Sequence, residues 1–256
     1  MKGLRKKFRE ILDINNWDVF TFGMLERDGG LSKKYLYRCL KEFIQEGEIV
    51  ILQSDVYCRA GFSDPYLISN FLVPDGTIGY LSALYKHGFT DYSPDMIYVQ
   101  TLKKKRETTI LATKYKFIQI KPEKAGGIEM TGQDTHAFRI TDREKTLVDC
   151  FDLPQYACEF FDLVKIFTRN HFDQHKLISY CNLINNNAVI KRLGYIAEVF
   201  KLPYEKFINY AQMRTSHTLC QLDPYGGAKV SNNPVSRWRI YININMIELF
   251  THVRHG

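Results

Sequence analysis

The alternation of apolar and polar residues is clearest between residues 31 and 46, where apolar side chains recur every three or four positions. This spacing places them on one stripe of an α-helix that packs against a core. The stripe consists of Leu31, Tyr35, Leu36, Cys39, Leu40, Phe43 and Ile44. Ser32 stands where a residue that caps the helix is expected. The remaining face is basic up to Glu42, so we predict an amphipathic helix with a cationic exposed face.

The flanking segments predict a small domain around this helix. Residues 1–12 read as a basic amphipathic helix and residues 18–27 as a second helix, followed by a turn. After Gly47, residues 49–52 and 56–59 read as the two strands of a hairpin with a turn at residues 53–55. The order helix, helix, turn, helix, hairpin predicts a winged helix-turn-helix domain over residues 1–62. The basic face of the first helix is interpreted either as an arm that contacts DNA or as a solvated surface.

The basic helix is the candidate DNA-recognition element, because such a helix can bring lysine and arginine to the phosphates of a groove. The predicted contacts in the helix are Ser32, Lys33, Lys34, Tyr37, Arg38 and Lys41, and those in the hairpin are Gln53, Ser54 and Arg59. An alternative stays open, because charged helix faces are commonly just solvated and a helix with a hairpin occurs in many α+β cores.

The rest of the chain, residues 63–256, predicts a larger α/β domain. Candidate strands are residues 96–101, 114–121, 128–130, 137–140 and 237–244. Candidate helices are residues 77–86, 142–152, 159–168, 173–185, 187–200 and 203–213, and a loop rich in glycine, asparagine and proline covers residues 224–234. The fold class that follows is α+β: a winged helix, then a mixed or antiparallel sheet and a helical bundle part.

Two short motifs in this larger domain have competing interpretations. Lys103, Lys104, Lys105 and Arg106 form a basic cluster, which either adds phosphate contacts or is a charged turn. Thr141 and Glu144 have the spacing of a capping box, so we interpret Glu144 as a helix-capping residue rather than a catalytic acid.

Composition narrows the class of protein. The formal net charge is +7, which suits a polyanionic partner. The six cysteines lack paired spacings, and no apolar segment is long enough to span a membrane, so we expect a cytoplasmic protein with reduced thiols. His171 and His175 are four residues apart but have no third ligand at a suggestive spacing, so no metal is expected. No cofactor-binding or nucleophile motif is present, and we predict neither a cofactor nor an enzyme.

Several stretches resemble the AbiEi family, the antitoxins of type IV toxin–antitoxin systems. The opening match consists of Val73, Pro74, Ser82, Ala83, Leu84, Tyr85, His87, Gly88, Thr90, Pro94, Tyr98 and Val99. Further matches are Lys121, Pro122 and Glu123, then Glu144, Lys145, Leu147, Asp149, Leu153 and Pro154, then Arg192, Leu193, Gly194 and Tyr195, and a closing Arg-Trp strand at residues 237–244.

The resemblance implies a cytoplasmic antitoxin that acts in abortive infection, a form of phage defence. Its winged helix would bind inverted repeats in its own promoter and repress the operon. Its C-terminal domain would counter a toxin with a nucleotidyltransferase fold, without a stable complex. Two alternatives remain: a stand-alone transcriptional regulator whose larger domain senses a ligand, and a nucleic-acid-processing enzyme.

Overall fold

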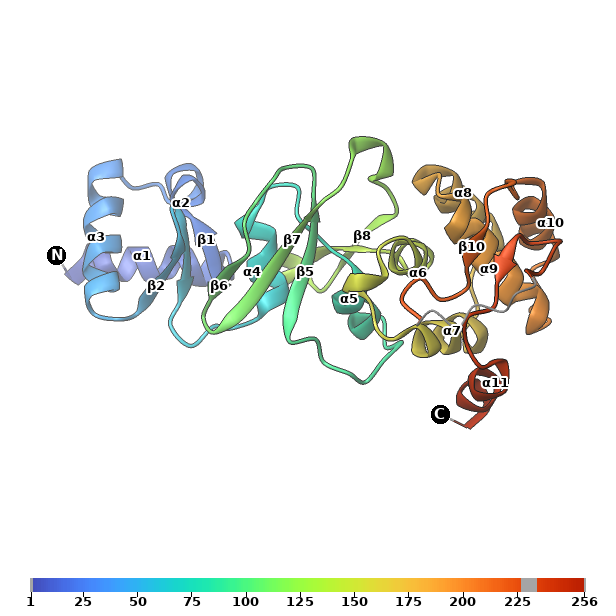
Figure 1. Ribbon diagram of the computed structural model, residues 1–256. Coiled ribbons are helices and arrows are strands. Elements are labelled where there is room, and N and C mark those ends of the chain that lie inside the picture. Colours follow the sequence, from blue (N-terminus) through green and yellow to red (C-terminus); the bar gives the residue numbers. More distant parts are fainter. Residues whose placement is uncertain (1, 227–233, 256) are drawn as a thin grey trace. The chain divides into compact units, whose positions relative to one another are not determined.

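The computed structural model describes residues 2–226 and 234–255 and shows a mixed α/β structure (Figure 1). Most of the predicted loop at residues 224–234 lies outside the described residues. The chain forms two compact units. Unit 1 comprises residues 1–78, 95–119 and 130–140, and unit 2 comprises residues 79–94, 120–129 and 141–256. The boundary predicted at residue 62 therefore falls inside unit 1.

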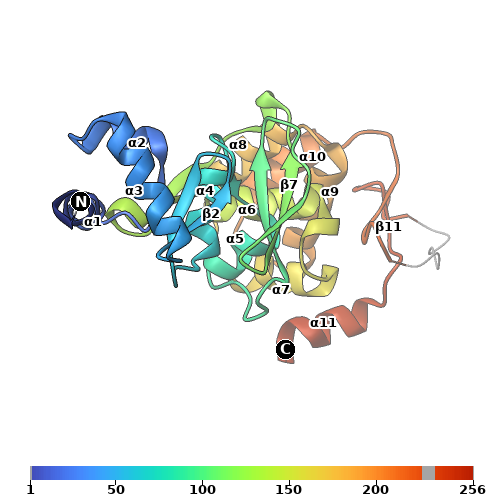
Figure 2. The same cartoon turned by 90° about the vertical axis from the view of Figure 1, so that its left-hand side faces the viewer.

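Unit 1 begins with three helices and a small sheet, seen together in Figure 2. The elements are α1 (Lys2–Ile14), β1 (Val19–Thr21), α2 (Phe22–Asp28), α3 (Lys33–Gln45), β2 (Ile49–Gln53) and β3 (Val56–Arg59). The strands are antiparallel in the order β1-β3-β2. Apolar side chains of α1, α2, α3 and β2 share one core, in which Phe8 lies against Phe43.

The single helix predicted for residues 18–27 is wrong, because the segment divides into β1 and α2. Val19 and Phe20 pair with Cys58 and Tyr57 of β3, which holds these residues extended. The Thr21 hydroxyl then accepts the Met24 N–H at 3.2 Å and caps α2. A pairing partner far along the chain therefore overrides the local helical pattern.

Helix α4 (Pro65–Leu72) was not predicted and follows directly on the hairpin. Asp64 caps it by accepting the Tyr66 N–H at 2.9 Å, and Pro65 occupies the first turn, where proline is favoured. Helix α4 contacts β1 of the small sheet and β4 and β5 of a larger one. It therefore links the two sheets within unit 1.

The larger sheet has six strands in the order β6-β7-β5-β4-β9-β8 and is mixed. Its strands are β4 (Thr77–Ile78), β5 (Met96–Thr101), β6 (Thr108–Ile110), β7 (Thr113–Gln119), β8 (Ile128–Thr131) and β9 (Phe138–Thr141). Residues 77–86 are not one helix, as predicted, because Ile78 pairs with Val99 and Ile140 before α5 (Tyr80–Lys86) begins. The predicted strands at residues 96–101, 114–121, 128–130 and 137–140 are confirmed within a residue or two.

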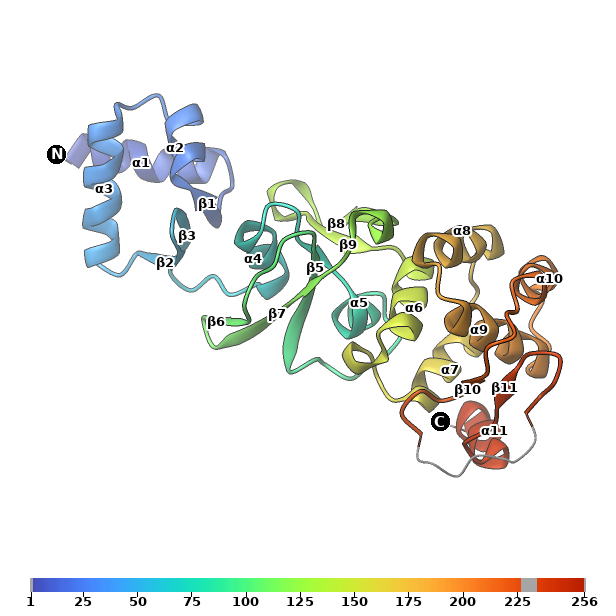
Figure 3. The ribbon, with the colours of Figure 1, turned by 45° about the horizontal axis from the view of Figure 1, so that its top comes forward.

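Unit 2 is mainly helical (Figure 3). It contains α6 (Arg143–Asp152), α7 (Phe160–Arg169), α8 (Gln174–Ile184), α9 (Asn187–Val199), α10 (Glu205–Met213) and α11 (Met246–His255). The first five confirm predicted helices, whereas α11 was not predicted. The strand predicted at residues 237–244 shortens to β11 (Ile240–Tyr241), which pairs with β10 (Cys220–Gln221). Single helical turns are η1 (Pro122–Lys124) and η3 (Pro154–Tyr156) in unit 2, and η2 (Asp134–His136) in unit 1.

The start of α6 differs from the predicted capping box. Asp142, rather than Thr141, is the N-cap, and its carboxylate accepts the Lys145 N–H at 2.8 Å. Glu144 instead accepts the Asp173 N–H at 2.9 Å and so ties α6 to the loop before α8. The capping role predicted for Glu144 is therefore wrong. Glu144 instead makes a tertiary contact between α6 and the loop before α8.

No helix among the described residues is long and apolar enough to cross a membrane.

Candidate nucleic-acid interface

Helix α3 has a buried face and a charged face, as its sequence pattern predicted. Leu36, Cys39, Leu40 and Phe43 are buried in the core of the N-terminal segment. Tyr35 was assigned to the apolar stripe but is 45 % exposed, which places an aromatic ring on the outer surface. Ser32 occupies the N-cap, yet its side chain makes no capping hydrogen bond. The Ser32 hydroxyl is therefore available to donate a hydrogen bond to a group outside the protein.

Lys34, Arg38 and Lys41 share one face of α3, because they follow helical spacing. All three are exposed. Arg38 Nε lies 3.1 Å from Glu42 Oε1. Lys34 and Lys41 make no ion pair or hydrogen bond within residues 2–226 and 234–255. This face therefore presents two ammonium groups with no internal counter-ion.

Lys33 and Tyr37 lie on the side of α3 that meets α2. Lys33 Nζ is 2.9 Å from Glu26 Oε1, and this hydrogen-bonded partner raises the pKa of the lysine. The Tyr37 ring stacks on Phe22 with the centroids 4.1 Å apart, although 54 % of Tyr37 is still exposed. These contacts fix the orientation of α3 against α2 and keep the Tyr37 edge at the surface.

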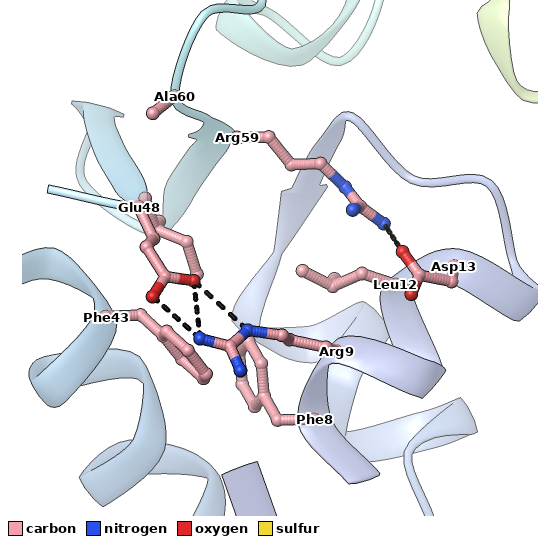
Figure 4. Close-up of a pocket in the computed structure, with 9 residues that line it drawn as sticks. Phe8, Arg9, Leu12, Asp13, Phe43, Glu48, Arg59 and Ala60 are labelled. Atoms are coloured by element: carbon pink, nitrogen blue, oxygen red, sulfur yellow. Dashed lines mark hydrogen bonds and ion pairs between the residues drawn. The ribbon is translucent and has the colours of Figure 1, made fainter. Parts of the chain in front are cut away.

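The arginines of α1 are engaged inside unit 1, where Arg9 lines a cavity of about 330 Å³ (Figure 4). Arg9 Nη2 donates to Glu48 at 2.7 Å across this cavity, and Arg5 pairs with Glu46. Both guanidinium groups lie 4.9 Å from the centroid of the Phe43 ring. Of the two readings of the first helix, these contacts favour a brace for α3 over an arm that contacts DNA.

The hairpin places its three predicted contact residues differently. Ser54 is exposed at the turn between β2 and β3. Gln53 donates from Nε2 to the carbonyls of Phe71 and Leu72, both at 3.2 Å. Arg59 donates to the Trp17 carbonyl at 3.0 Å and to Asp13 at 2.8 Å. Two of the three side chains therefore hold the hairpin in place, and their role as DNA contacts stays a prediction.

The four cations of the basic cluster after β5 also differ in whether they are engaged within the protein. Lys105 Nζ donates to Gln53 Oε1 at 3.0 Å and lies 4.9 Å from the Phe117 ring centroid, and burial lowers its pKa. Lys103, Lys104 and Arg106 are exposed. Lys105 therefore anchors the loop beside the hairpin within unit 1, and the other three cations remain at the surface.

In the part of the chain that the structure describes, no group of three His, Cys, Asp or Glu side chains is arranged to hold a metal ion. His171 and His175 do line the same pocket in unit 2. Sequence reasoning considered them only as metal ligands and did not see which side chains surround them, because those come from α6 and from the segment before α10.

Comparison with known proteins gives a fold but no family. No protein-family model and no curated protein matches the chain. The structure is similar to the crystal structure of the RV2827C protein from Mycobacterium tuberculosis, with a TM-score of 0.66. The similarity covers 97 % of this chain and 94 % of that chain at 14 % sequence identity. At this identity the likeness establishes a shared fold alone.

Proposed function

We propose that the chain is a DNA-binding repressor whose residues 1–62 form a winged helix-turn-helix, with α3 as the recognition helix. The order α1, β1, α2, α3, hairpin is typical of that domain. The observation that carries the proposal is the exposed face of α3. Lys34 and Lys41 lie on this face together with Arg38, and neither lysine has an internal counter-ion among the described residues. Cations in this state release counter-ions from DNA without first breaking an internal ion pair.

The proposed contacts can be ordered by how far each side chain is engaged inside the protein. Lys34, Lys41 and Arg38 would bind phosphates, and Ser32, Tyr35 and Tyr37 would reach the groove beside them. Lys33 forms an ion pair with Glu26 and would contribute less.

In the hairpin, Ser54 would contact the DNA backbone at the turn, whereas Gln53 and Arg59 would position that turn. Lys103, Lys104 and Arg106 would add phosphate contacts from the loop that Lys105 anchors.

The test is a footprinting experiment on the DNA upstream of the gene for this chain, with the full-length protein. We expect protection of an inverted repeat, with affinity at least about a thousandfold above that for unrelated DNA at physiological salt. Protection without sequence preference, or none at all, would contradict repression of its own promoter.

The antitoxin activity is a separate proposal, supported by the sequence resemblance to the AbiEi family and independent of the shape of α3. In it, residues 63–256 counter a toxin with a nucleotidyltransferase fold, without a stable complex and without catalysis by this chain. The test is co-expression of a neighbouring toxin gene with the full chain or with the variant Lys34→Ala/Lys41→Ala. We expect growth to be rescued by both, because the variant alters only the DNA-binding face. Failure of the wild-type chain to rescue growth, with DNA binding intact, favours the stand-alone regulator.

A further inference from the structure

A pocket of about 380 Å³ in unit 2 is lined by acidic, basic and aromatic side chains. Its walls come from the start of α6, the loop before α8, the first turn of α8 and the segment before α10. The apolar part of the wall is formed by Phe172, Pro203 and Tyr204. The volume is at the lower end of the range for small-molecule sites, so a small ligand fits better than a macromolecule.

The two carboxylates of this pocket both accept backbone hydrogen bonds. Glu144 is buried, accepts the Asp173 N–H at 2.9 Å and lies 3.7 Å from the Lys176 ammonium. Asp173 accepts the His175 N–H at 2.7 Å and the Lys176 N–H at 3.4 Å, which caps α8. These backbone hydrogen bonds lower the pKa of Asp173 and keep it ionised. Both acids therefore help to fix the loop before α8 and the start of α8, which shapes the pocket.

The three basic side chains of the pocket, in contrast to the acids, have no hydrogen-bond partner in the part of the protein that the structure describes. The side chains of Arg143, His171 and His175 make no hydrogen bond or ion pair within the described residues. The Arg143 guanidinium lies 4.9 Å from the ring centroid of Phe89 and 5.9 Å from that of Phe172, which orients its plane without using its N–H groups. The His171 ring packs beside Tyr204 with the centroids 6.4 Å apart. Three groups with unused donors thus line one small pocket.

We infer that this pocket is a binding site for a small phosphate ester. A phosphate group offers three acceptor oxygens to three donors, and arginine binds such a group with two parallel hydrogen bonds. The organic part of the ligand would pack on Pro203 and Tyr204. The site involves none of the DNA-binding residues, so the inference does not depend on the proposed function. It gives the larger part of the chain a ligand that a regulator could sense.

The test measures binding of phenyl phosphate, inorganic phosphate and benzoate to the full chain, by the broadening of ligand resonances in nuclear magnetic resonance. Phenyl phosphate should bind most tightly, inorganic phosphate less tightly because it lacks the ring, and benzoate most weakly because it lacks the third oxygen. Arg143→Met keeps the apolar stem on the two phenylalanine rings and should weaken phenyl phosphate binding by about ten- to a hundredfold.

His171→Leu/His175→Leu removes both ring donors, alters only exposed side chains and should weaken binding about tenfold in a folded protein. The controls are Arg254→Met and His217→Leu, which remove exposed basic groups outside the pocket and should bind like the wild type. The assignment is overturned if the wild type binds none of the three probes at millimolar concentration. It is also overturned if the pocket variants match the controls, or if benzoate binds as well as phenyl phosphate.

Discussion

Lys145 and Asp149 show that charged residues of the motif that resembles the AbiEi family have structural roles in this chain. Their side chains are 1 % and 3 % exposed, and the ammonium lies 2.5 Å from the carboxylate within α6. Glu144, also in the motif, secures the loop before α8. At the residue scale, these three charged residues therefore help to hold unit 2 together.

Asp149→Asn should lower the free energy of unfolding by about 3–5 kcal/mol, because it leaves a buried ammonium without its counter-ion. Removing both charges in Lys145→Met/Asp149→Leu should recover part of that loss. Urea denaturation followed by circular dichroism measures both changes. A loss below about 1 kcal/mol for Asp149→Asn would show that the pair is unimportant for stability.

Sequence reasoning identified which residues of the candidate site are charged but not which of them are already engaged. Lys34 and Lys105 look alike in the sequence, yet Lys34 has no internal partner and Lys105 donates to Gln53 and Leu72. Gln53 and Arg59 likewise bond to carbonyl groups of other elements. These partners are set by tertiary packing, which periodicity and composition do not encode.

At the scale of the element, helices with a sustained apolar period were predictable and very short strands were not. Helices α6 to α10 follow their 3.6-residue pattern closely. Strands β1 and β4 contain only three and two residues, so each owes its conformation to neighbours such as Tyr57 or Val99. Helix α4 was missed, although Asp64 followed by Pro65 is a recognisable helix start.

Gly194 in α9 is required for close packing, as expected for a glycine inside a helix. A Cβ atom there would lie 2.5 Å from the Trp238 ring and 2.7 Å from Ala211 Cβ. Gly194→Ala should therefore destabilise the protein by about 1–3 kcal/mol despite the better helix propensity of alanine. The matched control is Gly3→Ala in α1, where nothing lies within 4 Å and a small gain is expected. Chemical denaturation measures the free energy of unfolding of both variants. Equal stabilisation by the two substitutions would contradict the packing argument.

Helix α1 should brace α3 rather than contact DNA. Arg5→Gln/Arg9→Gln breaks the pairs with Glu46 and Glu48, so it should lower the melting temperature. It should leave the salt dependence of DNA binding unchanged, because neither guanidinium is expected to meet a phosphate. Thermal denaturation and binding titrations on the same variant separate the two effects. A clear fall in salt dependence would instead restore the arm interpretation.

At the scale of the whole molecule, the similarity to the RV2827C protein spans nearly the full length of both chains. The fold is thus shared with a solved structure, and this likeness says nothing about the charges on α3. The proposal of DNA binding therefore depends on the charges of α3 more than on the fold. Its central claim is that the exposed face of α3 binds phosphates.

The most direct test is the salt dependence of affinity for the upstream DNA, for the full chain and two double variants. Lys34→Ala/Lys41→Ala should reduce the slope of log K against log salt by about two units. Lys121→Ala/Lys206→Ala removes two exposed lysines from unit 2 and should leave the slope unchanged. If the α3 variant keeps the slope and affinity of the wild type, α3 is not the DNA-binding element.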